Sequence, residues 1–263
     1  MANFDFDQAE GLRRMLAGPR PRVLTFLSVL RDEEKNAMLA NLGASLVQTG
    51  SDVLLVDARF ASKGIASRFG ATRRASLLDV ARQEKELDEV VQPVSQGLGL
   101  VSLARGRQNL ASRDEADAQR LANTFDLLAR RAGVVMVDGE LDANDSFPLP
   151  AMAEGQIVVQ MSPGAASIKS AYSLIKRLSG CMGRRSFGVL VTGASEAEAH
   201  LVYENMARTA SRYLAIQLDS MGSVPADEHL NRAAHLGRSV IDAFPLAGAS
   251  VAFRRLAGQL SLS

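Results

Sequence analysis

The sequence predicts a doubly wound α/β fold, in which helices flank a mostly parallel β-sheet. Short apolar runs alternate along the chain with longer helical patterns. Most of these runs are continuously apolar, which is typical of strands covered on both faces. The chain has 263 residues, of which 47% are hydrophobic, and this is enough for one α/β domain with a full core.

Seven apolar runs are predicted to be strands. They span residues 22–30, 52–57, 97–103, 133–138, 156–161, 186–192 and, as the least regular one, 214–225. Between them, apolar residues recur at spacings of three and four, which predicts helices with one buried face. These stripes are Met38, Leu39, Leu42 and Leu46; Leu121, Phe125 and Leu128; Ile168, Tyr172, Ile175 and Leu178; and Val202, Met206, Ala210 and Tyr213. The repeated strand–helix order favours a parallel sheet.

The composition bounds the function classes. A net charge of +1 gives no evidence for a nucleic-acid partner. The single cysteine, Cys181, cannot form an internal disulfide, and we expect it to be buried as a small hydrophobe. Three scattered histidines predict no metal site. Because no apolar run is long enough to span a bilayer and the N-terminus does not resemble a signal peptide, a cytoplasmic protein is expected.

The end of the first predicted strand raises the question of phosphate binding, because ligands of such sheets bind beyond the carboxyl ends of the strands. A phosphate loop needs glycines with converging backbone amides, then a lysine, then a Ser or Thr for Mg²⁺. Here Lys35 begins the following helix, but the acids at 32–34 replace the glycines and Asn36 replaces the hydroxyl. Three carboxylates would repel a triphosphate, so the local chemistry argues against a nucleotide site.

Residues 22–260 nevertheless resemble the MinD/ParA ATPases, the deviant-Walker family of P-loop NTPases. The segment ANLGASL (40–46) is similar to the helix that follows the phosphate loop in that family. The strand DVLLVD is similar to the family's VLLIDAD strand, and GVVMVD to its Walker B strand. Two family residues have no counterpart. The lysine that reaches the partner subunit's nucleotide falls on Leu30, and the aspartate that positions the attacking water falls on Arg59.

The resemblance implies ATP and Mg²⁺ as ligands, and we interpret the matching residues as relics of that site, without a catalytic residue. They are Lys35, Asn36, Asp57, Asp138 and, near the base, Pro225 and Asp227. The missing groups supply most of the positioning and charge stabilisation that phosphoryl transfer needs, so productive hydrolysis is not expected. The residues alone leave a simpler interpretation open, in which Asp57 and Asp138 are helix caps and Lys35 is solvated.

Residues 1–17 are predicted to form a partner-binding helix, joined by a linker (18–22) to the α/β domain (23–263). The alternative is that this amphipathic helix packs on its own domain. The segment DQAEGLR resembles the DQAxxLR motif of the FlhG/FleN family of MinD-like flagellar regulators. In that family the motif docks on the GTPase FlhF and stimulates GTP hydrolysis. The matching residues are Asp7, Gln8, Ala9, Leu12 and Arg13.

The functional hypothesis is therefore an FlhG-like regulator of flagellar biosynthesis that binds FlhF and other flagellar or regulatory proteins. One alternative is an active ATPase switch that binds ATP and forms a homodimer. Another is a MinD relative associated with partition or cellulose synthesis. The family's basic amphipathic helix at the C-terminus has no counterpart here, so membrane association is not expected.

Overall fold

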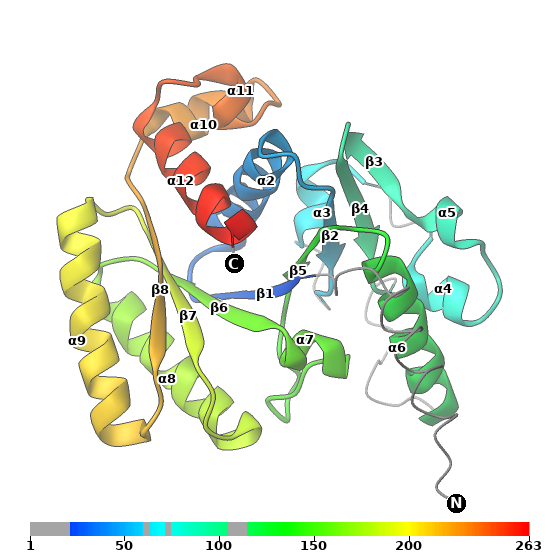
Figure 1. Cartoon of the computed structure of the whole chain (residues 1–263), viewed down its shortest axis with the longest axis horizontal. Coiled ribbons are helices and arrows are strands. Elements are labelled where there is room, and N and C mark those ends of the chain that lie inside the picture. The colour runs from blue at the N-terminus through cyan, green and yellow to red at the C-terminus, as the bar shows by residue number, and fades with distance from the viewer. Residues whose placement is uncertain (1–21, 60–63, 72–74, 105–114, 263) are drawn as a thin grey trace, which may run out of the picture.

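The computed structural model describes residues 22–59, 64–71, 75–104 and 115–262. The strands in this part of the chain are β1 (Arg22–Ser28), β2 (Val53–Asp57), β3 (Gln92–Ser95), β4 (Leu98–Ser102), β5 (Val134–Asp138), β6 (Gln156–Met161), β7 (Phe187–Thr192) and β8 (Leu218–Val224). They form one sheet in the order β3-β4-β2-β5-β1-β6-β7-β8 (Figure 1). Neighbouring strands pair in parallel, except for the antiparallel pair β3–β4.

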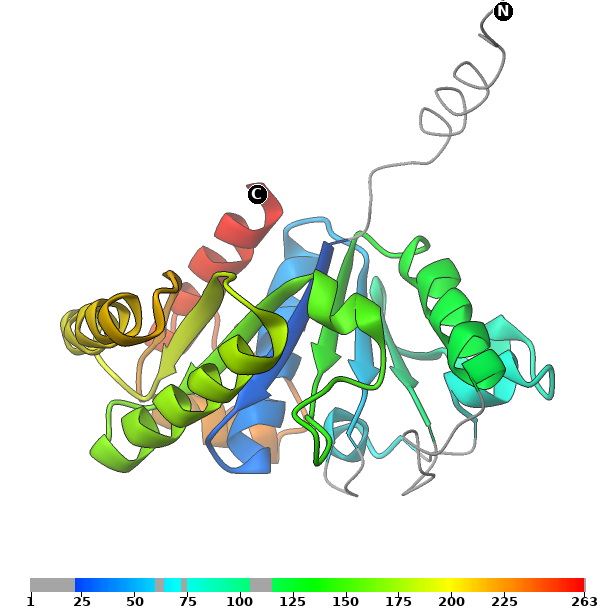
Figure 2. The same cartoon turned by 90° about the horizontal axis from the view of Figure 1, so that it is seen from below.

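Helices cover both faces of this sheet (Figure 2). They are α2 (Asp32–Gln48), α3 (Ile65–Arg68), α4 (Leu77–Ala81), α5 (Leu87–Val90), α6 (Glu115–Ala129), α7 (Pro150–Glu154), α8 (Ala165–Met182), α9 (Glu196–Leu214), α10 (Glu228–His235), α11 (Val240–Ala243) and α12 (Gly248–Leu262). One face packs against α2, α3 and α10 to α12, and the other against α4 to α9.

Strand residues alternate between the two layers, as the pleat requires. In β2, Val53 and Leu55 belong to the core under α2, whereas Leu54 and Val56 belong to the core under α4 and α6. The doubly wound, mostly parallel sheet predicted from the apolar runs is thus confirmed. Each of the seven predicted strands is present, several with trimmed ends.

The long helices α8 and α9 have clear end signals. Ser195 is the N-cap of α9, and its side chain accepts a hydrogen bond from the Glu198 amide at 3.3 Å. Gly183 ends α8 with a φ of 74°, a left-handed conformation that favours glycine. Both helices return antiparallel to the strands, so their C-terminal ends lie side by side at the amino edge of the sheet (Figure 1).

Three sequence predictions are wrong or incomplete. The edge strand β3 was not predicted, because it is polar and contains Pro93. Cys181 is exposed rather than buried, since it lies on the solvent face of α8. Tyr213, at the end of the predicted stripe of α9, is 66% exposed because the helix runs past the edge of the core there.

Within the described residues, no helix is both long and apolar enough to cross a membrane.

Candidate functional site

The connection from β1 to α2 is only three residues long. The helix begins at Asp32, so the acids at 32–34 form its first turn rather than a loop. Arg31 is the N-cap, and its carbonyl accepts hydrogen bonds from the Glu34 and Lys35 amides, both at 3.1 Å. Carboxylates in a first turn complement the positive end of the helix dipole. The three acids therefore explain why α2 starts this early, which the sequence analysis did not predict.

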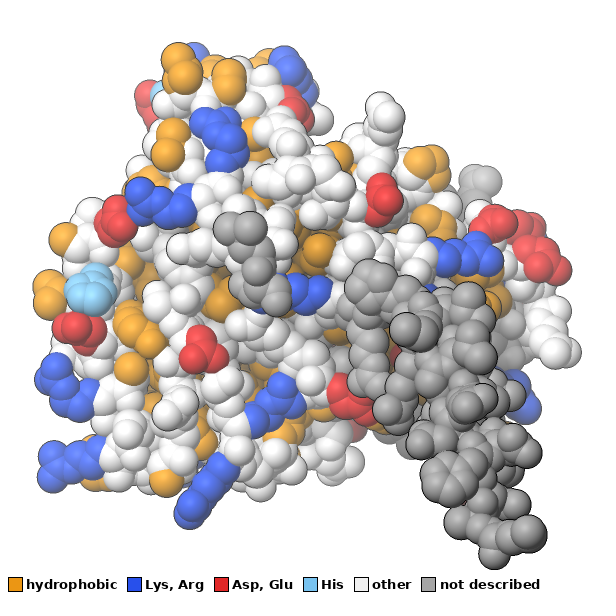
Figure 3. Space-filling view, viewed as in Figure 1, with side chains coloured by type: hydrophobic (Ala, Val, Ile, Leu, Met, Phe, Trp, Pro, Cys, Tyr) orange, Lys and Arg blue, Asp and Glu red, His pale blue; other side chains and the backbone are white. Residues whose placement is uncertain are grey.

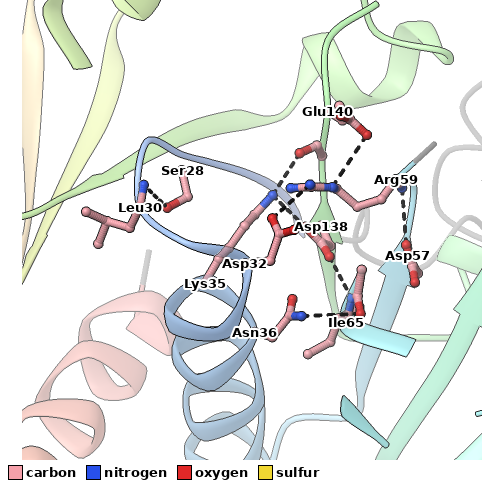
Figure 4. Close-up of polar contacts among 12 residues, drawn as sticks. Ser28, Leu30, Asp32, Lys35, Asn36, Asp57, Arg59, Ile65, Asp138 and Glu140 are labelled. Atoms are coloured by element: carbon pink, nitrogen blue, oxygen red, sulfur yellow. Dashed lines mark hydrogen bonds and ion pairs between the residues drawn. The ribbon is translucent and has the colours of Figure 1, made fainter. Parts of the chain in front are cut away.

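Lys35 points from the first turn of α2 into the protein (Figure 4). It is 1% exposed, and its Nζ lies 2.5 Å from Oδ1 of Asp138. The same Nζ donates a hydrogen bond to the Gly139 carbonyl at 2.8 Å. Burial lowers the pKa of Lys35, and the Asp138 charge opposes this shift. The interpretation of Lys35 as a solvated helix lysine is thus wrong.

Asp138 and Asp57 hold the start of α3. Oδ2 of Asp138 accepts a hydrogen bond from the Ile65 amide at 2.7 Å, and Oδ2 of Asp57 accepts one from the Ala66 amide at 3.1 Å. Gly64 must lack a side chain here, because a Cβ atom on it would lie 2.2 Å from Oδ1 of Asp57. Both carboxylates thus cap this helix, as the simpler interpretation proposed.

Asn36 completes this group. Its Nδ2 donates to the Gly64 carbonyl at 3.3 Å, so its amide meets the segment that the two aspartates hold. Four of the six residues selected from the sequence, Lys35, Asn36, Asp57 and Asp138, are therefore brought together at the tips of β2 and β5.

Arg59 lies across this group and was not selected as a site residue. Its guanidinium is bonded to Oδ1 of Asp32 at 2.8 Å, and its Nε is 3.4 Å from Oε2 of Glu140 (Figure 4). The Arg59 side chain is only 15% exposed. The sequence did hold a signal for this contact. Arg59 and Glu140 each stand two residues after an aspartate that ends a predicted strand. Counting only residues that the structure describes, the charged groups at these tips carry more negative than positive charge.

Pro225 and Asp227 lie elsewhere, beyond β8, which β6 and β7 separate from β1. The carboxylate of Asp227 accepts hydrogen bonds from the amides of His229 and Ala249, both at 2.9 Å, and thereby joins α10 to α12. Burial raises the pKa of Asp227, but these bonds and the His229 ring, 2.8 Å away, outweigh it, so the pKa is lowered. Neither residue contacts the group around Lys35.

Other selected residues lie outside the described part of the chain. These are Asp7, Gln8, Ala9, Leu12 and Arg13 of the N-terminal motif. Among the described residues, no group of three or more His, Cys, Asp or Glu side chains is arranged to hold a metal ion.

Comparison with known proteins gives one distant relative and many structural neighbours. The chain is 28% identical to the antiactivator FleN of Pseudomonas aeruginosa over 224 residues, which are 85% of this chain and 80% of FleN. No family model matches the sequence.

Two solved structures show the fold. MinD from Aquifex aeolicus superposes with a TM-score of 0.67 at 19% identity, covering 92% of this chain and 97% of MinD. MinD from Pyrococcus horikoshii, solved in complex with Mg-ADP, has a TM-score of 0.63 at 16% identity, covering 91% of this chain and 96% of that one. The chain thus has a MinD-like fold and is distantly related to FleN.

Proposed function

Starting from a MinD-like fold and a distant relationship to FleN, we propose that this protein is an FlhG/FleN-type regulator of flagellar biosynthesis that acts by binding partners, without hydrolysing ATP. The claim that the protein does not hydrolyse ATP rests on one observation, the buried ion pair between Lys35 and Asp138. It engages Lys35, the described lysine that the resemblance aligns with the lysine that neutralises a nucleotide's phosphates.

The ion pair would have to be broken before a phosphate could use Lys35. That would leave the Asp138 carboxylate buried without its cation, and removing one partner of a buried pair costs roughly 3–5 kcal/mol. A bound Mg²⁺ could offset part of this, but the metal would need the oxygens that Asp138 and Asp57 now offer to the amides of α3.

The N-terminus of α2 supports the same conclusion. Helix N-termini bind phosphate because free amides and the helix dipole favour an anion there. In this chain the first turn of α2 carries Asp32, Glu33 and Glu34, whose carboxylates already supply negative charge at this end of the helix. Asn36 directs its amide nitrogen to Gly64, and as an amide it is a weak substitute for a Mg²⁺-binding hydroxyl.

Arg59 supports the loss of hydrolysis independently. It stands where the resemblance would place an aspartate that orients the attacking water. A guanidinium cannot accept a proton or a hydrogen bond from water. Here it is paired with Asp32 and Glu140 across the mouth of the site. The residues present therefore do not fit Mg-ATP, and we assign no step of a reaction to them.

The binding half of the proposal rests on the N-terminal motif. By its similarity to DQAxxLR, the helix that the sequence predicts for residues 1–17 would dock on an FlhF-type GTPase. Gln8 and Arg13 would face the GTPase site, and the linker would provide reach. The α/β body would serve as a scaffold for further flagellar or regulatory proteins. The MinD relative from Aquifex aeolicus that was solved with MinC gives a precedent for a protein partner on this fold.

Two measurements test the two halves separately. In the first, isothermal calorimetry with ATP and Mg²⁺ on the full chain should show no binding. An affinity in the micromolar range would contradict the proposal and favour the ATPase switch, for which the Mg-ADP complex of the Pyrococcus MinD is a precedent.

In the second measurement, the full chain should raise GTP turnover by FlhF, and Gln8→Ala should abolish the increase. Gln119→Ala on α6 is the matched control and should leave the stimulation unchanged, because Gln119 is exposed and bonds only within its helix to Asn123 in the described structure. If the wild-type chain does not stimulate FlhF, the partition or cellulose-synthesis alternative gains support.

A further inference from the structure

A basic surface covers the C-terminal ends of α8 and α9. Residues 176–187 and 205–214 contain six basic side chains and no Asp or Glu, although the whole chain is close to neutral. The six are Lys176, Arg177, Arg184, Arg185, Arg208 and Arg212. In Figure 3, basic side chains gather over the lower ends of these two helices. We call this set the α8–α9 basic surface.

Only some of these six side chains are engaged by other residues of the protein. Arg185 donates hydrogen bonds to the carbonyls of Ala153 and Gly155, and Arg177 pairs with Asp145. For the exposed side chains of Lys176, Arg184 and Arg208, the described residues provide no ion pair. Arg212 is the one member that lies in the last turn of its helix, where a cation complements the helix dipole. The helix ends therefore do not explain why the other cations are here.

Acidic side chains nearby do not cancel the charge. Asp145 is already paired with Arg177, and Glu204, one turn before Arg208 on α9, lies 3.2 Å from His200. Two further exposed acids, Glu154 and Asp219, lie at the same edge of the sheet, which leaves four acids beside six cations. The surface thus keeps a net positive charge. Because it lies at the amino edge of the strands, it is at the opposite end of the sheet from Lys35, and nothing in the site at the strand tips requires it.

The composition of the surface indicates its partner. Five of the six cations are arginines, and the Arg212 guanidinium lies over the ring of Tyr213, 5.3 Å from its centroid. Tyr213 is 66% exposed, so a partner could contact the apolar face of its ring next to the Arg212 guanidinium. Arginine and tyrosine are enriched at protein interfaces and lysine is depleted, whereas contact with lipid headgroups or phosphates requires no exposed aromatic ring.

We propose that the α8–α9 basic surface docks an acidic segment of a partner protein. Carboxylates of that segment would pair with Arg184, Arg208 and Arg212, since guanidinium groups bind carboxylates in a bidentate manner. An apolar side chain of the segment would pack on Tyr213. This site is additional to the N-terminal motif and does not depend on the proposed function.

The test uses the full-length protein and a labelled acidic probe, a peptide of about sixteen residues that alternates Glu or Asp with Leu or Phe. Fluorescence anisotropy should show saturable binding that weakens as salt is raised. The double variant Arg184→Glu/Arg208→Glu should reduce the affinity at least about tenfold, and Tyr213→Ala about threefold. Arg130→Glu/Lys169→Glu is the matched control, because both side chains are exposed, lie outside this surface and pair with no described residue, and the change in charge is the same.

Each other outcome overturns the proposal. Absence of saturable peptide binding would do so, and so would an equal loss in the control pair, since the effect would then reflect net charge alone. Tighter binding to a 20-base-pair duplex or to vesicles containing phosphatidylserine would assign the surface to phosphates instead. Circular dichroism checks that the variants are folded, and Arg184→Gln/Arg208→Gln replaces the charge reversal if they are not.

Discussion

Replacing Lys35 by methionine measures how strongly the buried ion pair stabilises the fold. Methionine keeps most of the apolar stem of lysine but removes the ammonium. The Asp138 carboxylate, 1% exposed, then loses a counterion that lies 2.5 Å from its Oδ1. Such a loss costs roughly 3–5 kcal/mol. Because Asp138 keeps its 2.7 Å hydrogen bond from the Ile65 amide, we expect the lower end of that range.

A second substitution separates the charge effect from packing. The double variant Lys35→Met/Asp138→Asn removes both charges of the pair, and the asparagine carbonyl can still accept the hydrogen bond from the Ile65 amide. Removing both charges should therefore restore at least about 1.5 kcal/mol of the stability lost in Lys35→Met alone, because no uncompensated ion is left in the core. Urea unfolding followed by circular dichroism measures this as a shift of the midpoint at an unchanged slope.

Lys85→Met is the control for this experiment. Lys85 forms an exposed i,i+4 ion pair with Glu89 at 2.9 Å, and such pairs contribute about 0.3–0.5 kcal/mol. The argument about Lys35 is refuted if Lys35→Met is no more destabilising than Lys85→Met. The ammonium would then be solvated and available to a ligand, and the main objection to nucleotide binding would be lost.

Two further predictions concern the contacts of aspartates. Gly64→Ala should destabilise the protein by about 1–3 kcal/mol in thermal or urea unfolding, since its Cβ would lie 2.2 Å from Oδ1 of Asp57. The control is Gly180→Ala in α8, where a Cβ has open space. In the same assay this variant should be neutral or stabilise the protein by up to about 1 kcal/mol. The lowered pKa of Asp227 means that its contribution to stability is present above its unfolded pKa and is lost as the pH falls through the lower folded value. The free energy of unfolding should therefore decrease as the pH is lowered below about 4, and this decrease should be smaller in Asp227→Asn. An equal decrease in both proteins would show that the carboxylate does not hold the His229 and Ala249 amides in solution.

The fold could be predicted because its main signals are local. A strand such as β5 is an apolar run that needs burial on both faces, and any register in a parallel sheet satisfies that need. The stripe Leu121, Phe125 and Leu128 likewise defines the buried face of α6 without reference to the rest of the chain. Where local signals were weak, as in β3 with its Pro93, prediction failed.

The site could be located but not described, because its contacts are distant in the sequence. Lys35 was expected to begin the helix and lies instead at the end of its first turn, and its partner is Asp138 in β5. Whether that lysine points to solvent or into the core depends on how β1, which leads into α2, is placed next to β5. The spacing of residues along the chain does not reveal that placement. The same holds for Arg59, whose role was visible only after Asp32 and Glu140 were brought beside it.

Under the proposed function Lys35 and Asp138 derive from a nucleotide site, and the buried pair then offers a physical reason why they outlast nucleotide binding. Once Lys35 and Asp138 are each other's counterion, a substitution of either one leaves a buried charge, whereas substitutions on the surface usually cost little. Under the proposed function, the two residues are kept as a pair for stability while the glycines, the hydroxyl and the second aspartate, which served only the ligand, are free to be replaced. The Lys35→Met/Asp138→Asn variant tests this directly. It should be as competent as the wild type in stimulating FlhF, because the pair supports the fold and takes no part in the contact with the GTPase.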